Sequence, residues 1–422
     1  MDTLHIEGPV RLDGTVEISG SKNASLPIMA ATILAPGESV IQGVPRLADI
    51  SVLEQLLEGM GASVARSDDG DVHIDTSTIN NPVGEYDIVR KMRASICILG
   101  PLVARWGRAE VSMPGGCAIG DRPVDIHVRG LRELGADIHL DNGNIIARAE
   151  KGLKGKRIFL GGPFGSTVLG TANVMMAAVL AEGTTVIESA ACEPEICDLA
   201  NCLNAMGAKI SGTGSPRLTI EGVSSLNPVK YRVIGDRIEA GTFMVAAAIT
   251  AGCVEMQNCE LEHLLAVVDR LERIGVAVEA TDKGCIVRRE GAIRPADITT
   301  QPYPGFPTDL QAQLMAMLAL ADGNSVITEK IFPDRFMHVA ELNRMSAHLR
   351  KEGPSVIVEG VERLVAAPVM ASDLRASAAL VLAGLAAEGT TVVNRVYHID
   401  RGYERIERKL NSLGAKILRK QE

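Results

Sequence analysis

A glycine-containing turn signal recurs six times along the 422 residues, and this repetition limits the possible folds more than any single motif. The shared glycines are 66 to 76 residues apart, and a second turn signal such as "AMGAKI" follows each one after 23 to 28 residues. A repeat of this length is one βαβ-type unit rather than one turn of a solenoid. The shared glycines are Gly37, Gly107, Gly183, Gly252, Gly323 and Gly389.

The segments around these glycines alternate between two kinds of helix. An Ala-rich, almost uniformly apolar run precedes each glycine, as in "TANVMMAAVLA", and a helix that is apolar on every side is buried. Between the two signals the pattern is amphipathic, as in "ADISVLEQLLEGMGA", and short β-branched runs such as "TVIES" predict strands. Because single cores rarely exceed roughly 300 residues, the repeats predict two α/β domains of three units each, with buried helices inside and sheets and amphipathic helices around them.

Composition excludes several classes of function. A net charge of −9 and an aromatic content of 3% disfavour a nucleic-acid-binding protein. The chain shows neither a signal peptide nor an apolar run long enough for a membrane span, so we expect a cytoplasmic protein. The eight cysteines form no C-x-x-C pair and have no histidine at ligand spacing, which predicts reduced thiols and no metal site.

Charged residues gather just upstream of the buried helices. Helix N-termini favour anions, so a cleft that collects these residues would suit an anionic ligand. The alternative is that they are helix caps and surface turns that repeat with the fold. The residues concerned are Lys22, Arg93, Asp236, Asp309, Asp373 and Arg375.

Three further segments leave alternatives open. The glycine-rich "GGPFGSTVLGT" (161–171) lacks the lysine of a P-loop, and both a phosphate cradle and a plain hairpin-to-helix turn remain possible. His127 alternates with apolar residues, which favours a half-buried histidine with a partner. Asp400 and Arg401 stand before the last amphipathic helix, and this pair reads as a capped helix start rather than a site.

The segment "VSMPGGCAIGDRPVD" (111–125) is more informative. Its proline and glycines leave few side chains that could pack, so Cys117 is not expected in a core. The nearby Arg122 would favour the thiolate and make the sulfur nucleophilic. The loop suggests a mobile lid that brings a reactive thiol to an anionic substrate, and the alternative is an inert surface cysteine.

Eight motifs together resemble the UDP-N-acetylglucosamine 1-carboxyvinyltransferase family of the EPSP synthase superfamily, nearly end to end. The motifs are "GSKNASLP" (20–27), "KMRAS" (91–95), "MPGGCAIGDRPVDIHVRGL" (113–131), "YRVIGDRIEAGTF" (231–243), "FPTDLQAQ" (306–313), "RFMHVAEL" (335–342), "DLRASAALVLAGLAAEGTTVV" (373–393) and "YHIDRGYERIE" (397–407).

The resemblance implies two inside-out α/β domains with three-fold internal repeats. One would span residues 21–233 and carry the loop 113–123 and the sugar-nucleotide contacts; the other would combine 1–20 with 234–422. The active site would lie in the interdomain cleft. Hinge and interdomain residues would include Asp236, Asp373 and Glu193.

The family's activity would be transfer of the enolpyruvyl group of phosphoenolpyruvate to the 3-hydroxyl of UDP-N-acetylglucosamine, with release of phosphate through a tetrahedral ketal. This is the first committed step of peptidoglycan precursor synthesis, and so bears on cell-wall biogenesis, cell shape and cell division. No metal or organic cofactor is implied. Two anions must meet where water is excluded, which requires several cations. Alkylation of Cys117 by the antibiotic fosfomycin is also expected.

Site residues follow from the matching motifs. Asp309 would be the general base for the 3-hydroxyl, and Cys117 would act as general acid, bond covalently to phosphoenolpyruvate, or aid product release. Phosphoenolpyruvate would be held by Lys22, Arg122 and Arg401, with Arg335 and Arg375 nearby. The sugar nucleotide would be bound by Asn23, Arg93, Arg122, Pro123, Val124, Asp125, Ile126, His127, Ser166, Thr167, Val168, Leu169 and Ile331.

One segment departs from the family pattern. Where common members have a lysine or aromatic residue followed by V-S-V-G, this chain has "STVLG", Ser166 to Gly170. Contacts from backbone N–H groups to a diphosphate would survive, whereas a contact from a lysine would not. The departure predicts weaker sugar-nucleotide binding at this point or compensation elsewhere.

Three other functions are alternatives to this one. A 5-enolpyruvylshikimate-3-phosphate synthase shares the implied fold, but its Lys-Ser and Gly-Asn-Ala-Gly-Thr signatures are missing and the Pro-Gly-Gly-Cys loop is present. An RNA 3′-terminal phosphate cyclase would need a basic surface. A non-catalytic paralogue that only binds the sugar nucleotide is disfavoured by intact Lys22, Cys117, Asp309 and Arg401. Oligomeric state does not follow from the sequence.

Overall fold

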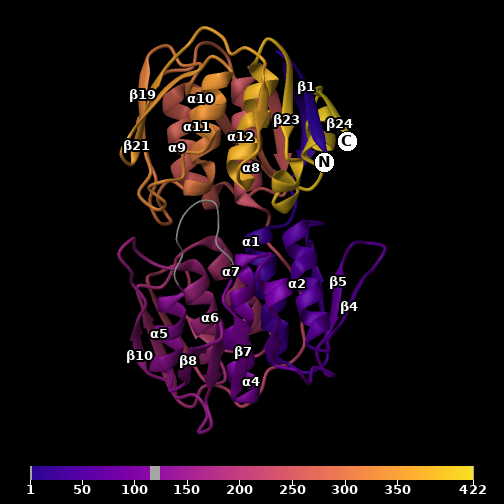
Figure 1. The fold of residues 1–422 in the computed structure, drawn as a ribbon, viewed down its shortest axis with the longest axis vertical. Helices are drawn as coiled ribbons and strands as arrows, with labels where there is room; N and C mark the ends of the chain where they lie inside the picture. The colour runs from indigo at the N-terminus through magenta and orange to yellow at the C-terminus, as the bar shows by residue number, and fades with distance from the viewer. Residues whose placement is uncertain (1, 115–123, 422) are drawn as a thin grey trace. The chain divides into compact units, whose positions relative to one another are not determined.

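A computed structural model describes residues 2–114 and 124–421. These residues divide into two compact units, each with its own apolar core (Figure 1). Unit 1 combines residues 2–19 with 235–421, and unit 2 comprises 20–114 and 124–234. Cys117, Arg122 and Pro123 lie outside the described residues.

Unit 2 contains three copies of one arrangement of strands and helices. The first copy has α1 (Lys22–Ala31), a 3-10 helix (Thr32–Leu34), β3 (Glu38–Gln42), α2 (Ala48–Gly59), β4 (Ser63–Arg66), β5 (Val72–Asp75) and β14 (Lys230–Arg232). The second has β6 (Val83–Gly84), α3 (Tyr86–Val89), η2 (Arg93–Ile98), α4 (Leu99–Trp106), β7 (Arg108–Ser112), α5 (Asp125–Glu133), β8 (Asp137–Asp141) and β9 (Asn144–Arg148). The third has β10 (Arg157–Phe159), α6 (Val168–Ala178), β11 (Thr184–Glu188), α7 (Pro194–Ala205), β12 (Lys209–Ser211) and β13 (Arg217–Glu221).

Unit 1 repeats the same arrangement three times. Its first copy has β2 (Asp13–Glu17), α8 (Arg237–Ile249), β15 (Cys253–Gln257), η3 (Leu261–Leu264), α9 (Leu265–Ile274), β16 (Val276–Thr281) and β17 (Gly284–Arg289). The second has β18 (Ile298–Thr299), η4 (Thr308–Leu310), α10 (Gln311–Leu318), β19 (Asn324–Thr328), α11 (His338–Arg344), β20 (His348–Glu352) and β21 (Ser355–Glu359). The third has β22 (Pro368–Met370), α12 (Leu374–Ala386), β23 (Gly389–Asn394), η5 (Val396–Arg401), α13 (Ile406–Ser412), β24 (Lys416–Lys420) and β1 (Thr3–Gly8).

Six four-stranded sheets form in the described part of the chain, and all have one topology. An edge strand pairs in parallel with the next strand, and two antiparallel strands follow, as in β10-β11-β13-β12. The predicted fold of six repeated units in an α/β protein is thereby confirmed. Each copy also contains a second helix, where the amphipathic pattern predicts one, and a hairpin after it.

Chain segments distant in sequence complete three of the sheets. In unit 2, β14 pairs with β3 and supplies the missing edge strand of the first copy. In unit 1, β2 pairs with β15, and β1 lies between β23 and β24. Both ends of unit 2 meet, since the Ser21 N–H donates to the Ile234 carbonyl at 2.7 Å.

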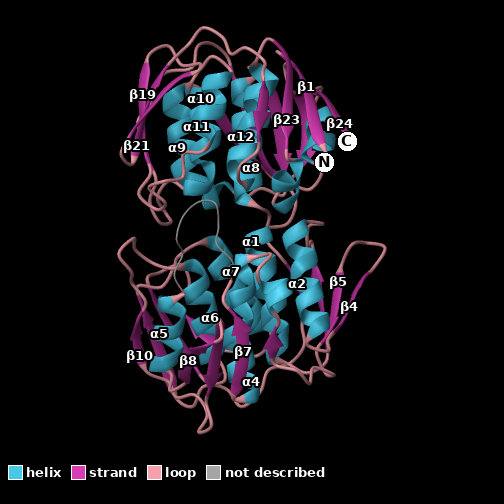
Figure 2. Cartoon of the chain, in the orientation of Figure 1, coloured by secondary structure: helices cyan, strands magenta, loops and turns pink. Residues whose placement is uncertain are grey.

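The Ala-rich runs form buried helices, as predicted. All eight residues of α10 are buried, and so are twelve of the thirteen in α8. In the amphipathic α9 only three residues are buried. Figure 2 shows the strands of each unit lying around its helices, which is the inside-out arrangement expected from the repeats.

The second turn signal of each copy requires a left-handed residue. The backbone has φ near 100° at Gly61, Gly135, Gly207, Gly275 and Gly414. In the fifth copy the equivalent residue is Ser346, with φ of 69°. An asparagine brackets this turn in three copies: the amide of Asn343, for example, donates to the Leu349 carbonyl and accepts from the Leu349 N–H, both at 2.9 Å.

Candidate active site

Asp309 of unit 1 is the centre of a cluster of charged side chains. It lies in η4, directly before the buried helix α10. Arg335 donates from Nη1 to Asp309 Oδ1 at 2.7 Å, and Arg375 donates from Nε to Oδ2 at 3.3 Å. Chain segments 26 and 66 residues away therefore place two guanidinium groups on one carboxylate.

Helix capping holds the neighbouring aspartates. Asp373 caps α12 by accepting from the N–H groups of Arg375 and Ala376 at 2.8 and 3.1 Å, and its Oδ1 lies 3.9 Å from Arg335 Nη2. Asp236 caps α8 in the same manner. Both were expected at hinge or interdomain positions together with Glu193, which precedes α7; the structure gives the two aspartates a capping role, and the hinge role stays a prediction.

Both arginines keep their charge although they are buried. Burial alone would lower the pKa of Arg335, but the carboxylates of Asp309 and Asp373 outweigh it and raise that pKa above its ordinary value. The pKa of Arg375 is also raised, because Tyr403, Asp309 and Asp236 outweigh its burial. The Arg375 guanidinium stands 5.3 Å from the centre of the Tyr403 ring, a distance typical of a cation–π contact. Both guanidinium groups of the cluster are thus permanently charged.

Sequence reasoning missed Glu329, a fully buried carboxylate beneath this cluster. Its Oε1 accepts from the Thr300 hydroxyl at 2.7 Å and from the N–H groups of Ile331 and Phe332 at 2.8 and 3.0 Å. Its Oε2 accepts from the Thr308 hydroxyl at 2.8 Å, and Thr308 Oγ1 accepts from Arg335. Glu329 therefore ties the backbone at Ile331 to the residue next to Asp309.

Lys22 occupies the corresponding position in unit 2, at the start of the buried helix α1. Ser21 caps this helix, and the Lys22 side chain is 10% exposed. Its Nζ lies 3.2 Å from Asp49 Oδ2 on α2. The neighbouring Asn23 is half-buried. Asp49 had no signal in the sequence beyond its place in the first turn of an amphipathic helix.

The segment from Val124 to His127 forms the start of α5. Val124 precedes the helix, Asp125 is exposed, and Ile126 is half-buried. His127 is 5% exposed and its Nδ1 lies 3.0 Å from Asn173 Nδ2. Burial and the charge of Arg93 lower the pKa of His127 to about 4, while Asp125 acts in the opposite direction. Arg93 begins η2.

The segment Ser166 to Leu169 forms a capped helix start. Gly162 and Gly165 close a tight turn, and Thr167 caps α6 by accepting from the Gly170 N–H at 3.2 Å. Val168 and Leu169 are the first residues of the helix. The stretch is a tight turn that leads into a helix, a structure common to both alternatives, and phosphate binding here stays a prediction.

One interpretation of the C-terminal motif is wrong. Asp400 and Arg401 do not start the last helix, because they end η5, and α13 begins only at Ile406. Asp400 instead accepts from Arg419 Nη1 at 2.9 Å and is also bonded to Nη2 of the same guanidinium. Burial is the main cause that lowers the pKa of His398. The positive charge of Arg401 lowers this pKa further, whereas the carboxylate of Asp373 acts in the opposite direction. Arg401 and Asp373, the residue that caps α12, therefore act on the same side chain.

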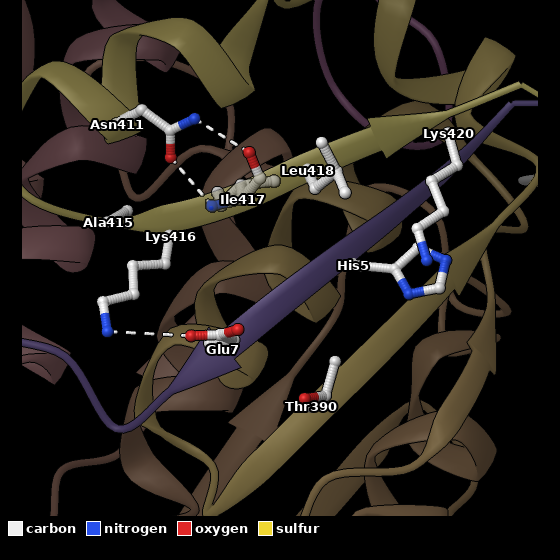
Figure 3. Close-up of a pocket in the computed structure, with 9 residues that line it drawn as sticks. All are labelled: His5, Glu7, Thr390, Asn411, Ala415, Lys416, Ile417, Leu418 and Lys420. Carbon is white, nitrogen blue, oxygen red and sulfur yellow. Dashed lines mark hydrogen bonds and ion pairs between the residues drawn. The ribbon is translucent and has the colours of Figure 1, made fainter.

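Other features of the described residues add no second chemical site. A hollow on the outer face of the β1–β23–β24 sheet contains the Lys416–Glu7 pair at 3.7 Å and none of the predicted site residues (Figure 3). Within residues 2–114 and 124–421, no three His, Cys, Asp or Glu side chains gather as metal ligands. No helix in this part of the chain has the length and hydropathy of a membrane span. The seven cysteines described are free.

Fold and charge cluster agree with one class of protein. The sequence model of the family "EPSP synthase (3-phosphoshikimate 1-carboxyvinyltransferase)" matches residues 6–410. The enolpyruvyl transferase NikO from Streptomyces tendae superposes with a TM-score of 0.88 at 25% identity, covering 100% of this chain and 99% of that one. The EPSP synthase of Acinetobacter baumannii, at 19% identity and a TM-score of 0.78, shares the fold. The chain belongs to the EPSP synthase family.

Curated relatives narrow the comparison to one branch. A protein from Trichlorobacter lovleyi is 55% identical over the whole of both chains. A second, from Methylacidiphilum infernorum, is 54% identical over 99% of each chain. Both are named UDP-N-acetylglucosamine 1-carboxyvinyltransferase. The resemblance stated from the eight motifs is thereby confirmed.

Proposed function

We propose that the protein transfers the enolpyruvyl group of phosphoenolpyruvate to the 3-hydroxyl of UDP-N-acetylglucosamine and releases phosphate. The observation that carries this proposal is identity of 54–55% over the full length with proteins of that name. The proposed reaction is the first committed step of peptidoglycan precursor synthesis. The proposed compartment is the cytoplasm. The charge cluster supports a reaction between two anionic substrates.

Unit 1 would supply the base and part of the anion site. Asp309 would take the proton of the 3-hydroxyl, and Arg335, Arg375 and Arg401 would face phosphoenolpyruvate. Without substrate, the Asp309 carboxylate offsets the charge of two buried guanidinium groups. An arriving phosphate or carboxylate would compete for these cations, which would free Asp309 to accept a proton.

Unit 2 would supply the sugar-nucleotide contacts and a further cation. Lys22 would act as a point charge on phosphoenolpyruvate, held in place by Asp49. Asn23, Arg93, Asp125 and His127 would contact the sugar nucleotide. Val124, Ile126 and Ile331 would be apolar contacts of the same ligand. Catalysis would therefore require residues of both units.

The helix start at Ser166–Leu169 would bind diphosphate through backbone N–H groups only. Thr167 Oγ1 is engaged as the cap of α6, and no lysine stands here. We expect a dissociation constant for UDP-N-acetylglucosamine above that of relatives with a lysine at this point. Equal values, measured by isothermal titration calorimetry on both proteins, would count against this part of the proposal.

Arg122, Pro123 and Cys117 belong to the proposal through their motif alone. Arg122 would bind phosphoenolpyruvate, and Cys117 would act as general acid, covalent nucleophile or aid to product release. Fosfomycin should then alkylate Cys117. Cys97 and Cys202 are poor competitors for the drug, because burial raises the pKa of each thiol to about 12. Peptide mass analysis after incubation with drug and sugar nucleotide would locate the adduct.

The decisive experiment is phosphate release from phosphoenolpyruvate, with and without UDP-N-acetylglucosamine. Wild type should release phosphate only with the sugar nucleotide, and Asp309→Asn and Cys117→Ala should release much less. Asp68→Asn removes an exposed carboxylate in unit 2 and serves as the matched control. Binding of the sugar nucleotide without release would establish the non-catalytic alternative, and release dependent on shikimate 3-phosphate would establish the EPSP synthase.

A further inference from the structure

Asn173 is a polar residue in the middle of the apolar helix α6, and it is completely buried. Its side-chain amide makes three hydrogen bonds, one to each of three other helical segments, α4, η2 and α5. Oδ1 accepts from the Gly100 N–H at 2.7 Å, and Nδ2 donates to the Ile96 carbonyl at 2.7 Å. Nδ2 also lies 3.0 Å from His127 Nδ1.

These partners fix the orientation of the amide. A backbone N–H can only donate and a carbonyl can only accept, so the oxygen of Asn173 must face Gly100 and its nitrogen must face Ile96. Exchange of the two amide atoms would place one donor against another donor, and one acceptor against another acceptor, inside the core. The atom that faces His127 is therefore an N–H donor.

The consequence for His127 follows from the chemistry of imidazole. Nδ1 must accept this hydrogen bond with its lone pair, so the proton of the neutral ring is on Nε2. Protonation of Nδ1 would place two buried donors face to face. Arg93 from η2 also disfavours the cation, and the only opposing charge that acts on the ring among the described residues is Asp125 of α5. Geometry and charge both favour the neutral Nε2–H tautomer.

Two glycines bring the neighbouring helices close enough for this arrangement. A Cβ on Gly100 of α4 would lie 2.2 Å from the Asn173 carbonyl oxygen. A Cβ on Gly130 of α5 would lie 2.4 Å from Val174 Cγ2. Both distances are too short for any side chain, so α4 and α5 pack against α6 through bare backbone. Asn173 and His127 therefore lie on helices that pack closely against each other.

We propose that Asn173 is a positioning residue which fixes His127 as the Nε2–H tautomer, so that His127 offers an uncharged hydrogen-bond donor to a diphosphate oxygen of the sugar nucleotide. The assignment of a ligand rests on the proposed function, whereas the assignment of the tautomer does not. A neutral donor binds a phosphate oxygen in the same way at pH 5 as at about pH 7, unlike an ordinary histidine with a pKa of about 6.5.

The tautomer is tested first, without substrate, by 15N NMR of protein labelled at histidine, with His127→Gln used to assign the signal. We expect His127 with the proton on Nε2 and no titration near its ordinary pKa of about 6.5. Asn173→Asp exchanges the donor for an acceptor, and should move the proton to Nδ1 and raise the pKa. A proton on Nδ1 in wild type, or titration near about 6.5, overturns the proposal.

The ligand is tested by calorimetric titration with UDP-N-acetylglucosamine. Glutamine can place its amide nitrogen where His127 has Nε2, whereas asparagine reaches only the position of Nδ1. His127→Asn should therefore weaken binding by roughly tenfold or more, and His127→Gln should weaken it much less. Equal losses in the two variants overturn the role of the Nε2–H. Absence of binding to wild type would refute the proposed function and the ligand assignment together, while the NMR result on the tautomer would stand.

Discussion

Ser346 is the residue at which the repeated fold and the local sequence disagree, and replacing it with glycine should stabilise unit 1. Five of the six copies have glycine at this left-handed position, and Ser346 adopts φ of 69° there. The left-handed conformation costs an L-residue roughly 1–2 kcal/mol. The greater freedom of glycine in the unfolded chain offsets roughly 0.5–1 kcal/mol of that gain. Ser346→Gly should therefore raise the free energy of unfolding by about 0.5–1 kcal/mol.

The reverse substitution in the same unit is the matched control. Gly414 occupies the same turn with φ of 102°, and a Cβ there would meet only the Arg11 carbonyl oxygen, at an ordinary distance of 3.5 Å. Asn411 brackets its turn as Asn343 brackets that of Ser346. Gly414→Ser should therefore destabilise unit 1 by about 1 kcal/mol or more, through backbone strain alone.

Each unit has its own probe. The single tryptophan, Trp106, lies in α4 of unit 2, so its fluorescence reports urea unfolding of that unit and should not change in either variant. Hydrogen exchange of peptides from β20 and β21 reports unit 1, and should slow about two- to fivefold in Ser346→Gly. Exchange that is unchanged or faster would refute the reasoning from φ, and so would a Gly414→Ser variant as stable as wild type.

Three further predictions concern buried polar groups. Burial lowers the pKa of His127 in unit 2 and of His338 in unit 1 to about 4, below the unfolded value of about 6.5. As the pH decreases, the unfolded state therefore binds protons before the folded state does. The free energy of unfolding should be constant above about pH 6.5 and fall by up to about 3 kcal/mol per histidine as the pH decreases toward 4. A urea midpoint that stays constant from about pH 7 to pH 5 would contradict this. Glu329→Ala leaves four donors without an acceptor and should lower the free energy of unfolding by about 4 kcal/mol or more. Glu329→Gln keeps an oxygen for three of these donors, so it should lower the free energy of unfolding by only about 1 kcal/mol, while still reducing phosphate release. Similar urea midpoints for the two variants would argue against this assignment of bonds. Asp49→Asn removes a buried counter-charge from Lys22 and should lower the stability of unit 2 by about 3 kcal/mol. Urea unfolding followed by Trp106 fluorescence measures this change, and an unchanged midpoint would show that the pair contributes nothing.

The repeats could be predicted because they depend on local requirements. A left-handed turn favours glycine, and a helix surrounded by other elements must be apolar on all sides, so both leave a pattern in the sequence. The pairing of β14 with β3, and of β1 with β23, leaves none, since these partners are far apart along the chain.

The residues of the candidate site could likewise be predicted from the sequence only in part. Asp309 and Arg375 stand out because charged residues just before apolar helices are conspicuous, but their hydrogen bond joins segments 66 residues apart. Glu329 lacks a signal, because its partners are mostly backbone N–H and hydroxyl groups. Asn173 does leave a signal in the sequence, because a single amide in an otherwise apolar helix must find hydrogen-bond partners when it is buried. Asp400 was misread because a distant arginine, Arg419, holds it.

The placement of β1 has a consequence for the order of events during synthesis on the ribosome. All strands of unit 2 lie between residues 20 and 234, so its three sheets can form while the rest of the chain is still being made. Strand β1 pairs on both sides with strands that follow residue 388. At about 5–20 residues per second its two edges stay unpaired for about 20–80 s. During that interval the first strand of the protein exposes two open edges, and this is the period in which a nascent chain of this fold is most open to misassociation or to capture by a chaperone.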